Sequence, residues 1–105
     1  MRWLTSILLL LVTGSLHAQD SFFIPGNAER GRLVFAQCRT CHYAESYMGH
    51  NNGPNLHRIF GKVAGKQEGF AYYSETFRAA EFVWTPQLMY AWLENPMRMF
   101  PDSTM

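Results

Sequence analysis

Hydrophobic and polar residues follow a helical period in three parts of the chain. Residues 27–38 carry apolar side chains at three- and four-residue spacing, which favours an amphipathic helix. Asn27 can cap its start, and Glu29 in its first turn suits the helix dipole. Residues 43–69 are rich in glycine and follow neither a helical nor a strand period, which indicates a long loop region.

Two further helices are predicted after this loop region. Ser74 can cap a short helix, and Thr85 can cap a longer one. Pro86 takes the first position of the longer helix, where the N–H that proline lacks has no helical partner anyway. We expect this helix to end near Asn95, because Pro96 follows it. No segment predicts a β-sheet, so the sequence predicts an all-α fold of short helices and long loops.

The chain begins with a short, strongly apolar segment. Arg2 precedes an apolar stretch over residues 4–12, and Ala18 is a small residue suited to cleavage. The stretch is about half of the ~20 residues that a membrane span needs. The pattern predicts a cleaved secretory signal over residues 1–18 and a single domain over residues 19–105. We therefore expect an exported protein, located in a bacterial periplasm.

The charge balance gives no sign of a nucleic-acid partner. Lys and Arg number nine and Asp and Glu number eight, so the basic excess typical of nucleic-acid binding is missing. The sequence also shows no phosphate-binding loop and no pairing of a nucleophile with a base. An enzyme is therefore not expected.

The residues that carry chemistry are concentrated in the pentapeptide "CRTCH". Its cysteines, Cys38 and Cys41, could close a disulfide or supply half of a zinc site. The predicted helical flanks disfavour a thioredoxin-like redox pair, and the other histidines are poorly spaced for zinc. The spacing CxxCH is also the signature of covalent haem attachment, in which both thiols form thioethers and His42 can reach the iron. This third interpretation uses every residue of the motif, and we favour it.

Five motifs resemble class I cytochrome c, the family of small periplasmic and mitochondrial monohaem cytochromes. They are "GRLVFAQCRTCH", "GPNLHRIFGKVAG", "GFAYYS", "WTPQLMYAWLENP" and "FPDSTM", in that order along residues 28–105. The resemblance implies the cytochrome c fold, with short helices and long loops wrapped around one covalently bound haem. It also implies a soluble one-electron carrier that works between respiratory or photosynthetic redox partners.

The resemblance also assigns roles to individual residues. Cys38 and Cys41 would carry the haem thioethers, and His42 would bind the iron. Pro54 would accept a hydrogen bond from that histidine, and Met105 would bind the iron from the other side. The residues expected to contact the haem propionates are Tyr72, Trp84 and Ser103.

Met105 is also the methionine best placed for the iron by its position in the chain. Met48 lies too close to His42 in sequence to cross to the other face, and Met89 belongs to a predicted helix stripe. The two methionines after Pro96 lie where the chain is only leaving that helix. A soft thioether suits iron in an apolar pocket. Ligation by His and Met leaves no open position on the iron and favours electron transfer over oxygen chemistry.

The sequence departs from the family in two places. Asp102 replaces the usual glycine before the axial methionine. The family continues into a C-terminal helix, whereas this sequence stops at Met105, so we expect a domain whose C-terminal helix is missing. The alternative function is a haem domain of a larger enzyme, or a gas-binding or peroxidatic haem protein with a labile sixth ligand. The expected partners are redox proteins or membrane electron-transfer complexes, and we expect the full-length protein to be a monomer.

We expect the purified protein to begin at Gln19 and to carry one haem. Cleavage after Ala18 would remove the apolar leader, and both haem thioethers lie on the part of the chain that remains. Mass spectrometry of the intact protein and of its N-terminal peptide measures both features. A haem-bearing chain that begins at Met1 would contradict the predicted leader.

Overall fold

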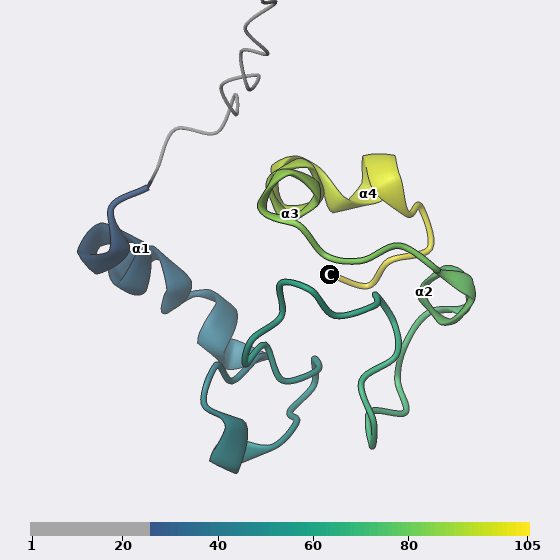
Figure 1. Cartoon of the computed structure of the whole chain (residues 1–105), viewed down its shortest axis with the longest axis horizontal. Coiled ribbons are helices and arrows are strands. Elements are labelled where there is room, and N and C mark those ends of the chain that lie inside the picture. The colour runs from purple at the N-terminus through teal and green to yellow at the C-terminus, as the bar shows by residue number, and fades with distance from the viewer. Residues whose placement is uncertain (1–25) are drawn as a thin grey trace, which may run out of the picture.

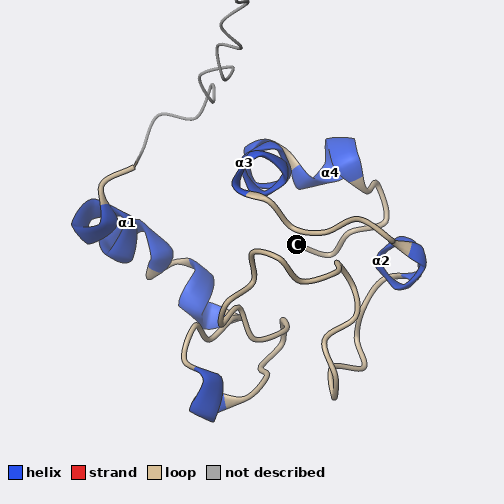
Figure 2. Cartoon of the chain, viewed as in Figure 1, coloured by secondary structure: helices blue, strands red, loops and turns tan. Residues whose placement is uncertain are grey.

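The computed structural model describes residues 26–105, and the predicted leader over residues 1–18 lies outside this range. Within the described range the fold is helical and contains no strand (Figure 1; Figure 2). The expected all-α fold is therefore confirmed. The α-helices are α1 (Ala28–Phe35), α2 (Glu75–Ala79), α3 (Pro86–Glu94) and α4 (Pro96–Met99), and short 3₁₀ turns cover Cys38–Thr40 and Ser46–Met48.

Helix α1 begins where its cap predicts but ends earlier than expected. The side chain of Asn27 accepts a 2.8 Å hydrogen bond from a first-turn N–H. The helix ends at Phe35, and the 3₁₀ turn Cys38–Thr40 follows after two turn residues. In this turn the N–H of His42 donates to the carbonyl of Cys38 at 2.8 Å. The CxxCH motif is thus held in a turn of its own and not in the last turn of α1.

The predicted caps also begin α2 and α3. The hydroxyl oxygen of Ser74 accepts from the N–H of Phe77 at 3.3 Å, and that of Thr85 accepts from the N–H of Leu88 at 3.1 Å. Helix α2 is short, as expected, and stops at Ala79, because the next residue has an extended backbone. Capping is local chemistry, which is why the sequence predicts these starts well.

Helix α4 was not predicted. Asn95 ends α3, and its side chain then accepts a 3.2 Å hydrogen bond from the N–H of Arg98. Pro96 occupies the first position of α4, where it needs no helical partner for its nitrogen. The Asn-Pro pair is therefore both the end of one helix and the start of the next.

Loops, not helix pairs, hold most of the fold together. Among the described α-helices, only the backbones of α3 and α4 lie close together, and α1 stands apart on one side (Figure 1). Leu33 and Val34 of α1 are exposed. An antiparallel bridge between Val63 and Val83 joins the long loop to the segment before α3. None of the described helices is long and apolar enough to span a membrane.

The buried core is small and mostly aromatic. Its ring pairs are mainly edge-to-face or tilted, with centroids 4.7 Å apart for Phe77 and Phe100 and 5.1 Å apart for Phe77 and Trp92. Such pairs contribute ~0.5–1.5 kcal/mol beyond the burial of area. They join α2, α3 and the segment after α4. The members of this aromatic cluster are Phe77, Phe82, Trp84, Trp92 and Phe100.

We expect Gly65→Ala to lower the free energy of unfolding more than Gly61→Ala does. Both glycines have a positive φ, +72° and +89°, so each alanine strains the backbone by about 1–2 kcal/mol. A Cβ on Gly65 would also overlap the carbonyl of Phe77 in α2, whereas nothing lies within 4 Å of a Cβ on Gly61. Thermal unfolding of the haem-loaded variants measures the difference. Equal losses would contradict the close contact between Gly65 and α2.

Candidate functional site

One cavity brings together all the residues that the sequence assigned to a cofactor. It has a volume of about 850 Å³ and lies between the CxxCH turn, the long loop, α3 and residues 103–105. These residues come from segments far apart in the chain. The assigned residues that line it are Cys38, Cys41, His42, Pro54, Tyr72, Trp84, Ser103 and Met105.

The lining of this cavity fits a large aromatic macrocycle. No Asp, Glu, Lys or Arg is found among the described residues that line it, and Leu56, Ile59 and Phe70 contribute apolar surface. The volume lies within the ~300–1,000 Å³ usual for ligand and cofactor sites. Burial of an apolar ring system in such a lining is favourable, and the polar edge of a haem can meet the few hydroxyl groups present.

The two thiols of the CxxCH turn are placed for attachment. Cys38 and Cys41 are free thiols that line the same cavity. The 3₁₀ turn between them is closed by a 3.0 Å hydrogen bond from the N–H of Cys41 to the carbonyl of Cys38. The turn therefore holds both sulfur atoms beside the site without joining them to each other.

The imidazole of His42 is oriented by one hydrogen bond. Its Nδ1 lies 2.7 Å from the carbonyl oxygen of Pro54. A carbonyl oxygen only accepts, so Nδ1 carries the hydrogen and donates it. Nε2 is then left with its lone pair free to bind a metal ion. The contact that the family resemblance implied for Pro54 is therefore present.

Backbone hydrogen bonds hold the loop that carries Pro54 against the CxxCH turn. The N–H of Gly53 donates to the carbonyl of Cys41 at 2.7 Å, and a second bond follows at Leu56. Gly53 is buried, and a Cβ placed on it would overlap the imidazole ring of His42. A glycine is needed here because the loop backbone lies directly against that ring.

Asn55 is a buried residue of this loop that the sequence analysis missed. Its side-chain amide donates to the carbonyls of Glu45 and Gly49, both at 2.8 Å, and its Oδ1 accepts from the N–H of His57 at 2.8 Å. One side chain thus satisfies backbone groups in a loop that has no secondary structure to satisfy them. The available signal was an asparagine beside Gly-Pro in such a loop.

The expected propionate contacts differ in burial. Trp84 is buried, and its indole N–H donates to no acceptor within the described part of the chain. Tyr72 is 79% exposed, at the rim of the cavity. Tyr73, which the sequence analysis missed, also lines the cavity, and its hydroxyl accepts from the N–H of Gln67 at 3.2 Å. Burial raises the pKa of Tyr73, whose ring packs against Phe70.

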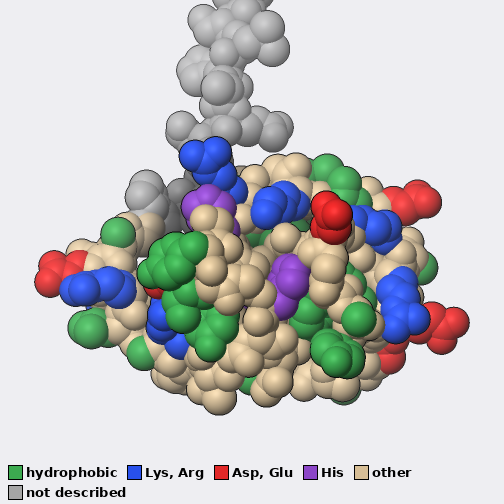
Figure 3. All heavy atoms as spheres, turned by 90° about the horizontal axis from the view of Figure 1, so that it is seen from below, with side chains coloured by type: hydrophobic (Ala, Val, Ile, Leu, Met, Phe, Trp, Pro, Cys, Tyr) green, Lys and Arg blue, Asp and Glu red, His purple; other side chains and the backbone are tan. Residues whose placement is uncertain are grey.

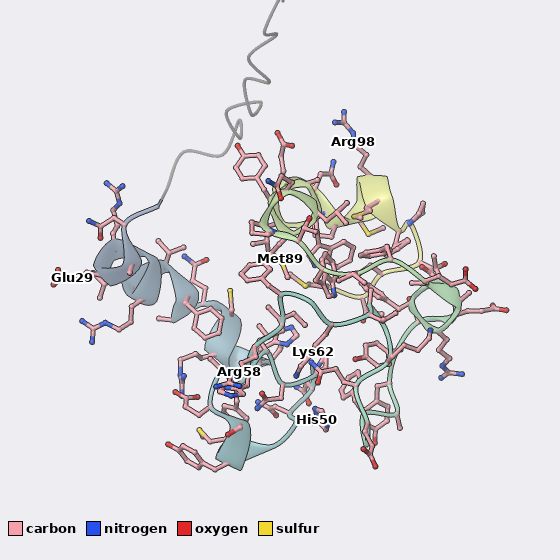
Figure 4. The ribbon with its side chains drawn as sticks, in the orientation of Figure 1. Glu29, His50, Arg58, Lys62, Met89 and Arg98 are labelled. Carbon is pink, nitrogen blue, oxygen red and sulfur yellow. The ribbon has the colours of Figure 1, made fainter. Side chains whose placement is uncertain are left out.

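Two methionines reach the cavity. Met105 lines it and is 52% exposed, and its N–H donates to the hydroxyl oxygen of Ser103 at 3.1 Å. The hydroxyl hydrogen of Ser103 stays free to donate. Met89 of α3 also lines the cavity and points inward, as Figure 4 shows. Met97 is exposed, and Met99 packs against the core.

Figure 3 shows one face of the described part of the molecule. On this face Lys and Arg side chains are interspersed with Asp and Glu, and they form no ring of basic residues. Arg39 lies in the CxxCH turn, and its guanidinium bonds the carboxylate of Glu45 at 2.8 Å. This hydrogen bond lowers the pKa of Glu45. Arg98 of α4 points away from the molecule (Figure 4).

We expect Gly53→Ala to weaken the binding of iron by His42. The added methyl group would push the ring away from Pro54, so its Nε2 would leave the cavity. Gly31→Ala is the matched control, because nothing lies within 4 Å of a Cβ there and its φ is not positive. Visible spectra of the oxidised, haem-loaded variants should show high-spin iron for Gly53→Ala alone. A spectrum like that of the parent protein in Gly53→Ala would show that the ring does not lie against this glycine.

Comparison with known proteins identifies relatives along most of the chain. This chain is 40% identical to cytochrome c of Chlamydomonas reinhardtii over 81 residues. The aligned residues make up 76% of this chain and 71% of the algal protein. Cytochrome c of Ginkgo biloba is 33% identical over 82 residues, 77% of this chain and 72% of its own. Cytochrome c of Kluyveromyces lactis is 35% identical over 81 residues, 76% of this chain and 73% of its own. No protein-family model matches the chain.

These relatives show that the predicted bacterial periplasm was wrong. An alga, a seed plant and a yeast are eukaryotes, and their cytochrome c is a protein of the mitochondrial intermembrane space. The prediction depended on the apolar leader over residues 1–18. A short apolar stretch after a basic residue does not specify the organism or the compartment in which the chain ends up.

The relatives and the cavity agree on the cofactor. Cytochromes c carry haem c through two cysteines, and this chain has two cysteines, both in its CxxCH turn. Haem c, attached through Cys38 and Cys41, supplies the redox couple, and the partners are redox proteins. The family transfers electrons and is not a family of enzymes. The chain belongs to the cytochrome c family, as a haem-based electron carrier.

Proposed function

We propose that this protein transfers single electrons between respiratory or photosynthetic redox partners through a haem ligated by His42 and Met105. The observation that carries the proposal is the fixed imidazole of His42, whose Nδ1 donates to Pro54 at 2.7 Å while the ring lines the cavity. The thioether of Met105 lines the same cavity and supports its role as the second ligand. Both axial positions of the iron are then occupied by protein.

This ligand pair suits electron transfer because it leaves no position for a substrate. Met and His together raise the reduction potential relative to ligation by histidine alone or thiolate. A lining without ionised side chains favours the less charged, reduced iron for the same reason that burial disfavours any charge. The ligand pair and the uncharged lining would thus both raise the reduction potential of the iron.

We propose that the propionates are held by neutral donors. Trp84, Tyr72 and Ser103 all line the cavity, and their indole N–H and hydroxyl groups would be the donors. A buried carboxylate is costly unless such donors reach it. Tyr72 would then close the rim of the site, which accounts for its exposure of 79% in this structure.

We also propose that residues 1–18 are a leader that is removed from the mature protein. The support is the sequence pattern of a basic residue, a short apolar stretch and a small residue before Gln19. The mass of the purified protein, measured as set out above, tests the removal.

A rival function has one observation in its favour. Met105 is 52% exposed, so its sulfur could leave the iron and open a position for a gas or a peroxide. The oxidised spectrum distinguishes the two functions. A sulfur-to-iron charge-transfer band supports a permanent methionine ligand, and high-spin iron without that band supports the rival.

We expect Met105→Ala to abolish the sulfur-to-iron band and to lower the reduction potential, because methionine stabilises reduced iron. Met99→Ala and Met89→Ala are the controls. Met99 packs against the core and Met89 is the other thioether on the cavity, so both should retain the band. Redox titration with visible spectra of the haem-loaded proteins measures both properties. A band that survives Met105→Ala but disappears in either control would transfer the ligand role to that methionine.

A further inference from the structure

The segment after α4 is held at two points before it reaches the cavity. Phe100 belongs to the aromatic cluster, with its ring centroid 4.7 Å from that of Phe77 in α2. Two residues later, Oδ2 of Asp102 accepts a hydrogen bond from the N–H of Thr76 at 3.2 Å. Thr76 lies in the first turn of α2. Both anchors therefore tie this segment to the same helix.

The carboxylate of Asp102 lies at the first turn of α2, where a negative charge is favourable. N–H groups in the first turn of a helix lack helical partners, and the positive end of the helix favours an anion. Hydrogen bonds from the N–H and then from the hydroxyl of Thr76 hold the pKa of Asp102 below its usual range, and the hydroxyl of Ser74 adds to this. Ser74 accepts from Phe77 through its oxygen, so its hydrogen is free to donate to Asp102.

The other hydrogen bonds of the described segment over residues 101–105 are local. The N–H of Ser103 donates to the carbonyl of Phe100 at 3.0 Å, and the N–H of Met105 donates to the hydroxyl oxygen of Ser103 at 3.1 Å. These bonds shape the turn but do not attach it to another element. Asp102 is the last residue before Met105 that is hydrogen-bonded to another part of the fold.

We propose that Asp102 is a positioning residue for the axial methionine. Its carboxylate ties the segment to the start of α2 and so restricts the positions that the sulfur of Met105 can take. A chain fixed close to its ligand atom has less conformational freedom to lose when that atom binds, so the bond withstands competitors better. The inference rests on the proposed ligation by Met105.

Competition by imidazole measures how firmly the methionine is held. The oxidised, haem-loaded protein is titrated with imidazole, and loss of the sulfur-to-iron band gives the apparent affinity. Asp102→Ala should raise that affinity about tenfold, the size expected for the loss of one charge-assisted hydrogen bond. Asp102→Asn keeps an acceptor oxygen and should give a rise of about threefold, between the parent and Asp102→Ala.

Glu81→Ala is the matched control for charge. Glu81 is exposed and does not line the cavity, so its removal takes away the same charge without touching the segment. Its imidazole affinity should equal that of the parent protein. A tenfold rise in Glu81→Ala as well would assign the effect to net charge and overturn the positioning role.

Hydrogen exchange supplies a measurement that does not depend on the iron. In Asp102→Ala the amide of Thr76 should lose protection, while the amides of α3 keep theirs. A variant that is merely less stable would instead exchange faster in all helices, and that result would overturn the local role. Hydrogen exchange therefore distinguishes a local loss of positioning from a general loss of stability, which the imidazole titration alone could not do.

Two outcomes distinguish failure of this inference from failure of the proposed function. If Met105→Ala abolishes the band but Asp102→Ala leaves the imidazole affinity unchanged, Asp102 does not position the ligand and Met105 remains the ligand. If the band survives Met105→Ala, the ligand assignment is wrong and the inference falls with it.

Discussion

The hydrogen bond from His42 to the carbonyl of Pro54, at 2.7 Å, is the contact on which the rest of the site depends. It selects the tautomer of the imidazole and aims the other ring nitrogen at the cavity. The bond requires the loop to lie against the CxxCH turn, which its backbone hydrogen bonds achieve. It also requires Gly53, because a side chain there would overlap the ring. Asn55 then keeps that loop in shape by satisfying its backbone groups.

The loops and helices of the described chain surround the cavity and do not pack into a helix bundle. In the described range α3 and α4 pack together, whereas the only helical element that α1 contacts is the short turn that carries the first cysteine. The aromatic cluster forms one wall, and the long loop forms another. Tyr72 and Met105 line the cavity and are exposed in this structure, so a haem held between these walls would bury part of their surface. Cofactor binding and chain stability are therefore linked, because a group that binds only the folded chain stabilises it.

What the sequence predicts well is local or carried by a motif. Asn27, Ser74 and Thr85 identify helix starts because a cap acts within three residues, and CxxCH identifies the cofactor because its spacing is set by the haem. The missed features involve partners distant in sequence or a second role for one residue. Asp102 could be noticed as a substitute for glycine, but its partner Thr76 is 26 residues away and only the fold brings them together.

The uncharged lining of the cavity bears on whether a proton moves together with the electron. Among the described residues of the lining there is no carboxylate, ammonium or guanidinium that could take up or release a proton when the iron changes its charge. The one imidazole there has its Nδ1 hydrogen committed to a backbone carbonyl. The side chains around the cavity therefore let the electron move without a proton.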